Sequence, residues 1–263
     1  MKKRLLILIS TSIVFSLATL IVYAKTYTPS ISEPKNFVTE EMVSTSAGLL
    51  SKLNSNNSIS KKEVVTDEYE NKTLYKISND KYSVNLDDSN NLVAIYSKYI
   101  ETTQISNKYD KATVENYILN KYKELNLPSE YELTYLEQFD DDIWEANFEK
   151  KYNGFYNKYE SVKTFFIPET DEIVALTVFN KKTNSNEISV NKDDAVLTAT
   201  QNLNIDASDI ISSKVSVEKA NTYYNESNSD TSLHTSWVLE TKDNSFIYVD
   251  ANSNSIIGGD CIE

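Results

Sequence analysis

The chain contains one histidine and one cysteine, and this scarcity limits the chemistry that its side chains can perform. With only His234 and Cys261, the sequence cannot supply a Cys/His or multi-histidine metal site. A Ser-His-Asp arrangement would need His234 in a sheltered pocket, but residues 225–236 (NESNSDTSLHTS) are polar and typical of a hairpin loop. We therefore predict that His234 is a bystander in a loop.

The common motifs for nucleotide binding and hydrolysis are absent from the sequence. It has no Walker-type GKS/T, GxGxxG, HExxH or GxSxG segment, and its 4 glycines leave little scope for a loop that cradles phosphate. A single Cys261 cannot form an internal disulfide. The sequence therefore predicts no catalytic residue, no cofactor site and no enzyme.

Two acidic segments resemble cation sites. Asp250, Asn252 and Asn254 reproduce the first half of a calcium loop, but the sixth and twelfth positions lack the required Gly and Glu. The triplet 140–142 (DDD) lies between two expected strands. We interpret the first segment as a hairpin and the second as an exposed turn, and predict no metal site. A glycosidase needs only two separated carboxylates, and the sequence leaves that possibility open.

Aromatic residues are dense in the segment 150–166 (KKYNGFYNKYESVKTFF). Alternating aromatics in strands commonly pack in cores and cross-strand pairs. Aromatic residues are also enriched at protein interfaces. We predict a protein-binding contact formed by Tyr152, Phe155, Tyr156 and Tyr159.

The N-terminus has the pattern of an export signal. Three basic residues precede the uncharged segment 5–24 (LLILISTSIVFSLATLIVYA), whose length matches the roughly 20 residues that a helix needs to cross a bilayer. The basic residues keep the N-terminus cytoplasmic, so the rest of the chain is expected to be extracytoplasmic. We expect a retained single-pass anchor at 1–24, with cleavage after Ala24 and secretion as the alternative, and a Pro-containing linker at 25–36.

The charge balance excludes one large class of partner. Removing the three basic residues of the N-terminal segment leaves 23 Lys and Arg against 39 Asp and Glu, a formal charge of −16. Such a surface repels nucleic acid and anionic headgroups. The sequence therefore predicts that the chain does not bind nucleic acid.

Three octets recur along the chain and predict three hairpin turns. Each octet has Ser or Thr at its fourth position, Asn or Asp at its fifth and two aliphatic residues at its end. The octets are LDDSNNLV at 86–93, IPETDEIV at 167–174 and DANSNSII at 250–257. Asn90, Asp171 and Asn254 occupy the fifth position, and Asn and Asp tolerate the left-handed backbone region when Gly is absent.

A helical segment with a capping residue precedes each hairpin. Thr39, Asp110 and Asn191 are the expected N-caps, and β-patterned segments follow each helix. We predict an α+β fold of three tandem units, each with one helix packed on an antiparallel β-sheet of three to four strands. The predicted units are 37–105, 106–186 and 187–263.

The third unit resembles a known domain family. The segment 236–260 (SWVLETKDNSFIYVDANSNSIIGGD) resembles the C-terminal half of a PepSY domain. The residues that match the family's ending are Trp237, Tyr248, Val249, Asp250, Ala251, Ile256, Ile257, Gly258 and Gly259, whereas Asn254 replaces its usual Gly. The second unit matches at Lys111, Ala112, Trp144, Glu172, Ile173 and Val174. The chain is thus similar to membrane-anchored PepSY-like repeat proteins of Gram-positive bacteria, including the YcdB/YcdC group and the PepSY region of YpeB-type proteins.

The resemblance implies an extracytoplasmic, non-catalytic module that binds or restrains a peptidase or another hydrolase of the cell envelope. The expected partner is therefore an envelope hydrolase or another extracytoplasmic protein. Two alternatives stay open at this point, a cell-wall glycan hydrolase that uses two carboxylates and a structural component of the wall or spore envelope.

Overall fold

The computed structural model describes most of the chain beyond the linker. The described residues are 36–53, 55–56, 58–67, 71–98, 109–140, 142–181, 183, 185–224, 226 and 228–261. The predicted anchor at 1–24 and the linker up to residue 35 lie outside them. Within these ranges, no helix combines the length and the apolar character that a membrane crossing requires.

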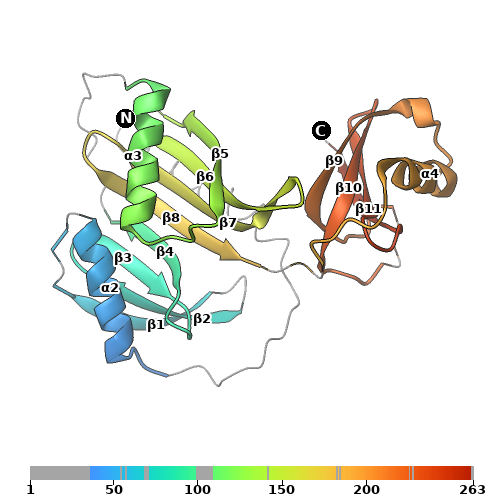
Figure 1. Cartoon of the computed structure of the whole chain (residues 1–263). Helices are drawn as coiled ribbons and strands as arrows, with labels where there is room; N and C mark the ends of the chain where they lie inside the picture. Colours follow the sequence, from blue (N-terminus) through green and yellow to red (C-terminus); the bar gives the residue numbers. More distant parts are fainter. Residues whose placement is uncertain are drawn as a thin grey trace, which may run out of the picture.

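The described residues form two antiparallel sheets and three α-helices (Figure 1). The eight-stranded sheet has the order β1-β2-β3-β4-β8-β7-β6-β5. Its strands are β1 (Lys61–Asp67), β2 (Lys72–Ser78), β3 (Tyr82–Leu86), β4 (Leu92–Ser97), β5 (Tyr131–Gln138), β6 (Trp144–Tyr152), β7 (Phe155–Ile167) and β8 (Glu172–Asn180). The four-stranded sheet, in the order β12-β11-β10-β9, comprises β9 (Ile210–Lys219), β10 (Leu233–Thr241), β11 (Ser245–Asp250) and β12 (Ile256–Cys261).

The predicted fold class, three tandem helix-on-sheet units, was wrong. Each predicted segment contains one helix and four strands, but the first eight strands form a single sheet because β4 pairs with β8. The described chain is therefore mostly antiparallel β, with sheets of eight and four strands. The turn pattern identifies hairpins within a segment, but it does not show which exposed strand edges will pair with each other.

The three expected helix caps are confirmed. The helices are α2 (Glu40–Lys52), α3 (Lys111–Glu124) and α4 (Lys192–Leu203). Side-chain oxygens of Thr39, Asp110 and Asn191 each accept a hydrogen bond from the backbone N–H three residues later, at 3.2, 2.7 and 2.9 Å. Each bond satisfies one of the N–H groups that a helix start leaves unpaired.

The three left-handed turns are also confirmed. Asn90, Asp171 and Asn254 have φ angles of 67°, 51° and 56°. The first two of these residues also contact the helix of their own segment. Asn90 donates to Thr45 of α2 at 2.8 Å, whereas Asp171 accepts from Tyr117 of α3 at 2.8 Å and pairs with the buried Lys121 at 2.8 Å.

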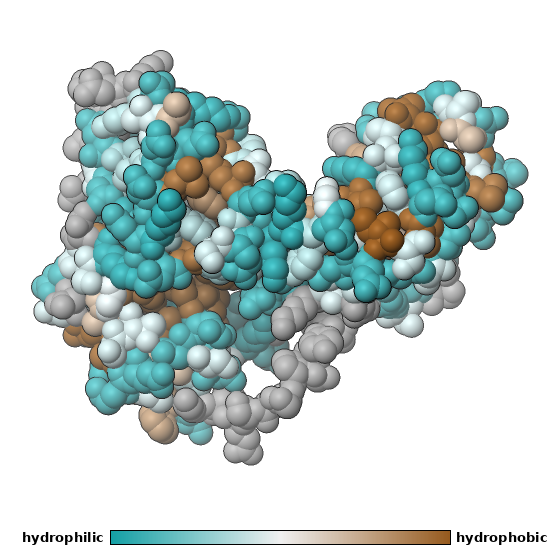
Figure 2. Space-filling view, in the orientation of Figure 1, coloured by the Kyte–Doolittle hydropathy of each residue, from teal (hydrophilic) through white to brown (hydrophobic). Residues whose placement is uncertain are grey.

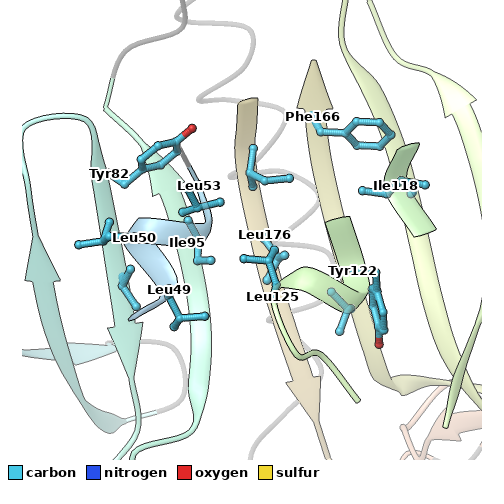
Figure 3. Packing of buried hydrophobic residues seen from close by; sticks show 14 of the residues in the cluster. Leu49, Leu50, Leu53, Tyr82, Ile95, Ile118, Tyr122, Leu125, Phe166 and Leu176 are labelled. Atoms are coloured by element: carbon cyan, nitrogen blue, oxygen red, sulfur yellow. The ribbon is translucent and has the colours of Figure 1, made fainter. Parts of the chain in front are cut away.

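The main core lies between α2, α3 and one face of the eight-stranded sheet. Figure 1 shows both helices on the same face, and Figure 3 shows Leu50 of α2 next to Ile95 and Ile118 of α3 near Phe166. A smaller core under α4 includes Ala195, Ala199 and Leu239. The opposite face of the eight-stranded sheet carries no described helix.

The contact between Asp171 and α3 yields a test of how the turn is fixed. We expect Asp171→Asn to lower the free energy of unfolding by about 1 to 3 kcal/mol, because Asn keeps the left-handed angle but removes a charged hydrogen-bond partner from Lys121. Urea denaturation measures this loss. Asp80→Asn, at an exposed position, serves as the control. Equal stability of the two variants would contradict the expected role of Asp171.

Candidate functional site

The four-stranded sheet packs against the eight-stranded sheet where β7 meets β9. Phe155 and Tyr159 of β7 are each 4% exposed and pack with Val217 of β9 and Leu233 of β10. We call these four residues the junction cluster. Because burial of a large apolar side chain contributes about 1.5 to 3 kcal/mol, the cluster is a substantial contact between the sheets.

An ion pair lies beside the junction cluster. The Lys158 ammonium donates to both carboxylate oxygens of Glu218 at 2.9 Å. The Glu218 side chain is 11% exposed, whereas that of Lys158 is 41% exposed, so solvent screens part of the attraction. The pair therefore sets the alignment of β7 against β9 more than it stabilises their contact.

A cleft of about 320 Å³ opens next to this ion pair. Strand alternation places Asn147, Glu149, Ser161 and Lys163 of its wall on the helix-free face of the large sheet, because their neighbours Phe148 and Val162 face the core. The lining residues are Asn147, Glu149, Lys158, Tyr159, Ser161, Lys163, Phe179, Glu218, Tyr248 and Asp260. Figure 2 shows the other side of the large sheet, where hydrophilic side chains dominate the surface.

The two lysines of the cleft wall form ion pairs, whereas Glu149 is a carboxyl group with a shifted pKa. Lys158 pairs with Glu218, and Lys163 pairs with Glu145 at 2.8 Å. Burial raises the pKa of Glu149, and the positive charge of Lys158 opposes that rise. A half-buried carboxyl group with a raised pKa in a cleft is a feature of functional sites. The cleft therefore has ion pairs beside it and one carboxyl group, that of Glu149, whose pKa is raised.

The four predicted contact residues fall into two structural groups. Phe155 and Tyr159 belong to the junction cluster, so their side chains make an intramolecular contact. Tyr152 donates to Glu160 at 2.8 Å, and Tyr156 donates to Glu132 at 2.7 Å. Contact with a partner at this hairpin stays a prediction, and of the four side chains those of Tyr152 and Tyr156 are partly exposed.

The prediction that His234 lies in a loop was wrong. It lies in β10 with a side chain that is 14% exposed. Nδ1 contacts Asp250 at 2.5 Å, and Nε2 contacts Asp230 at 2.8 Å. The sequence did not reveal this site because the polar neighbours of His234 suggested a loop, and because Asp250 lies on another strand.

Ser232, His234 and Asp250 resemble a catalytic triad in their contacts. Ser232 Oγ is 2.8 Å from Nε2 of His234, but it also donates to Asp230 at 2.6 Å. Hydrogen bonds to Asp250 and Asp230 raise the pKa of His234, which favours the imidazolium form. An imidazolium has no free lone pair with which to accept a proton from Ser232. This arrangement suits a structural role, in which the His234 side chain links β10 to the turn after β11. We call the contacts of His234 with Asp250 and Asp230 the His234 pin.

The calcium-like segment forms a hairpin turn, as expected. Asp250 Oδ1 accepts from the backbone N–H groups of Asn252 and Ser253 at 2.8 and 2.7 Å. These bonds and the contact with His234 lower the pKa of Asp250 to about 2, although burial acts in the opposite direction. Among the described residues, no group of three or more His, Cys, Asp or Glu side chains could hold a metal ion. Asp141, in the acidic triplet, lies outside them.

Comparisons with known proteins identify a similar fold. No family model matches the chain, and the search of curated proteins gave no match. Among solved structures, the C-terminal domain of Bacillus megaterium YpeB is similar, with a TM-score of 0.50 and 10% identity. The match covers 87% of this chain and 100% of that domain. A protein of unknown function from Clostridium leptum gives a TM-score of 0.27 at 11% identity, over 60% of this chain and 96% of that one.

The likeness to the YpeB domain shows that this chain has a YpeB-like fold. This is the part of the sequence resemblance that the structural comparison supports.

The junction cluster provides a test of how the cleft is held. We expect Phe155→Ala to lower the free energy that holds the two sheets together by about 3 to 5 kcal/mol, because the side chain fills the interface. The contact between the two sheets should therefore loosen. Hydrogen exchange should accelerate in β7 and β9 and remain unchanged in β2 and β3. Phe37→Ala, at a side chain that is 65% exposed, is the control. Unchanged exchange at the interface would contradict the assignment.

The His234 pin predicts a pH dependence of stability. Because the folded-state pKa of His234 lies above its ordinary value of 6.5, its contribution is complete below pH 6.5 and is lost as the pH rises through the folded-state pKa. We expect His234→Gln to lower the free energy of unfolding by about 1 to 3 kcal/mol at pH 6. The stability difference between wild type and this variant should shrink at higher pH. A difference that is constant from pH 6 to 9 would exclude the pin.

Proposed function

We propose that this chain is a non-catalytic extracytoplasmic protein that binds and regulates a peptidase or another hydrolase of the cell envelope. In this proposal, residues 5–24 anchor the chain in the membrane and the described part acts outside. The observation that carries it is the cleft between the two sheets, with ion pairs and aromatic side chains in its wall. The YpeB-like fold supports the general assignment. Membership of the YcdB/YcdC group rests on the sequence resemblance alone.

The composition of the cleft favours recognition of a protein segment. Phe179 supplies partly exposed aromatic surface above the buried Tyr159 and Tyr248, and Lys158 and Lys163 supply positive charge next to carboxylates. Protein interfaces combine aromatic anchors with polar groups in this manner. A peptide segment offers both backbone hydrogen-bonding groups and side chains of either charge, so it matches more of the wall than a uniformly charged ligand would.

The ion pairs beside the cleft suit electrostatic recognition of a partner. Glu218 accepts two hydrogen bonds from Lys158, and Glu145 contacts Lys163 at 2.8 Å. Ammonium groups therefore hold both carboxylates in place beside the cleft. They remain suitable for fixed electrostatic recognition of a partner.

One observation favours the glycan-hydrolase alternative. Glu149 has a raised pKa, and Asp260 lies in the same cleft. Glycosidases commonly pair a carboxylic acid of raised pKa with a second carboxylate. Under this alternative, Glu149 would protonate the leaving oxygen, and Glu149→Gln would abolish release of sugars from purified cell wall.

A crosslinking experiment tests the proposed role of the cleft. Phe179 is replaced with a photo-crosslinking phenylalanine analogue in the full-length chain, which is expressed in its native envelope. We expect illumination to link the chain to an envelope hydrolase, because Phe179 lines the cleft. The same analogue at Leu197, which is 52% exposed on α4, should not capture that enzyme. Mass spectrometry identifies the product, and assays of the enzyme with added chain measure regulation.

Charge reversal provides a matched comparison. Lys163→Glu should weaken binding of the captured enzyme by about tenfold or more, because it replaces a positive charge of the cleft wall with a carboxylate next to Glu145. Lys192→Glu makes the same charge change on α4 and should leave binding intact. Failure to capture a hydrolase, combined with wall hydrolysis that requires Glu149, would replace the proposal with the glycan-hydrolase alternative. Retention by purified wall with neither result would indicate a structural component.

A further inference from the structure

Three strands occupy equivalent places after the three repeated turns. These strands are β4, β8 and β12. β4 and β8 pair with each other through Ile95 opposite Leu176, with Ala94 opposite Thr177 on one side and Tyr96 opposite Ala175 on the other. Ile95 and Leu176 each lie five positions after the left-handed residue of their turn. The pairing therefore has local two-fold symmetry, centred on equivalent residues.

The equivalent residue of the third strand is Gly259, five positions after Asn254. It lies on the outer edge of the four-stranded sheet, because β12 is a terminal strand of that sheet. The side-chain amide of Asn221 donates to Gly259 O at 2.9 Å and accepts from Gly259 N at 3.1 Å. A side chain thus makes the two bonds that a neighbouring strand would make to this residue.

Further contacts close the same edge. The backbone N–H of Asn221 donates to Ile257 O at 2.9 Å, and Asn228 Nδ2 donates to the same oxygen at 3.0 Å. A Cβ atom on Gly259 would lie 2.3 Å from the ring of Tyr224. We call Asn221, Tyr224 and Asn228 the edge clamp. The glycine is required because the clamp lies directly against the strand.

We propose that the edge of β12 is a self-pairing edge that the edge clamp holds closed. When the clamp opens, two copies of the chain pair β12 to β12 about a two-fold axis at Gly259, as β4 and β8 pair within one chain. This inference goes beyond the proposed function, because no residue of the edge clamp lines the cleft and β12 reaches the cleft only through Asp260.

The sequence of β12 is compatible with this pairing. Antiparallel pairing centred on Gly259 places Asp260 opposite Gly258 of the second copy, so no like charges face each other directly. Cys261 lies opposite Ile257, and the outward backbone groups of Gly259 find equivalent groups in the second copy. Unpaired strand edges are templates for such association, which explains why the clamp covers this edge.

The test uses the full-length chain in detergent and the free, exposed Cys261. Wild type and Asn221→Ala/Tyr224→Ala are spin-labelled at Cys261, and their protein masses are measured by light scattering over a range of concentrations. We expect the wild type to be monomeric and the double variant to form dimers. In these dimers the two labelled residues are offset by four positions, or about 14 Å along the strands, so spin–spin broadening should appear.

Controls separate the proposed pairing from other outcomes. Asn202→Ala removes an exposed asparagine of α4 and should leave the chain monomeric. Hydrogen exchange at Gly259 shows whether the edge has opened, and exchange in β2 and β3 reports on folding. If the double variant unfolds, the milder Asn221→Asp is measured in its place. An opened edge without dimers, dimers without spin–spin broadening, a closed edge, or a wild type already paired through β12 would each overturn the proposal.

Discussion

The packing of Phe155 and Tyr159 against Val217 and Leu233 is the contact on which the candidate site depends. It holds the four-stranded sheet against the N-terminal part of β7, and the cleft lies where the two sheets meet. Apolar burial of this kind contributes about 1.5 to 3 kcal/mol per large side chain. A partly exposed ion pair such as Lys158–Glu218 contributes about 0 to 1 kcal/mol. The apolar residues therefore stabilise the contact between the two sheets, and the ion pair fixes the alignment of β7 against β9.

The three repeated turns have the same backbone conformation, but the strands that follow them have different neighbours. Asn90, Asp171 and Asn254 all reverse the chain in the left-handed region, which delivers a following strand to the edge of a sheet. In the first two segments these strands join two sets of four strands into one sheet. In the third, Asn221 covers the corresponding edge. The differences between the segments thus arise at strand edges, while the turns remain alike.

Sequence reasoning succeeded where the interaction was local. The N-caps and the left-handed turn residues depend on neighbours within a few positions, so residue type and spacing were sufficient to predict them. It failed for contacts between distant segments. The pairing of β4 with β8, the burial of Phe155 and Tyr159 at the junction, and the contact of His234 with Asp250 all depend on tertiary structure. The cleft was not predictable because its lining comes from both sheets.

Zero-length carbodiimide crosslinking of the unmodified chain shows whether the two sheets form a fixed cleft. The reagent joins a lysine to a carboxylate in contact with it, and mass spectrometry identifies the linked peptides. We expect a Lys158–Glu218 link, because these groups lie 2.9 Å apart across the junction. The Lys111–Glu137 pair, also at 2.9 Å but away from the junction, is the internal control. A control link without the Lys158–Glu218 link would contradict a fixed cleft.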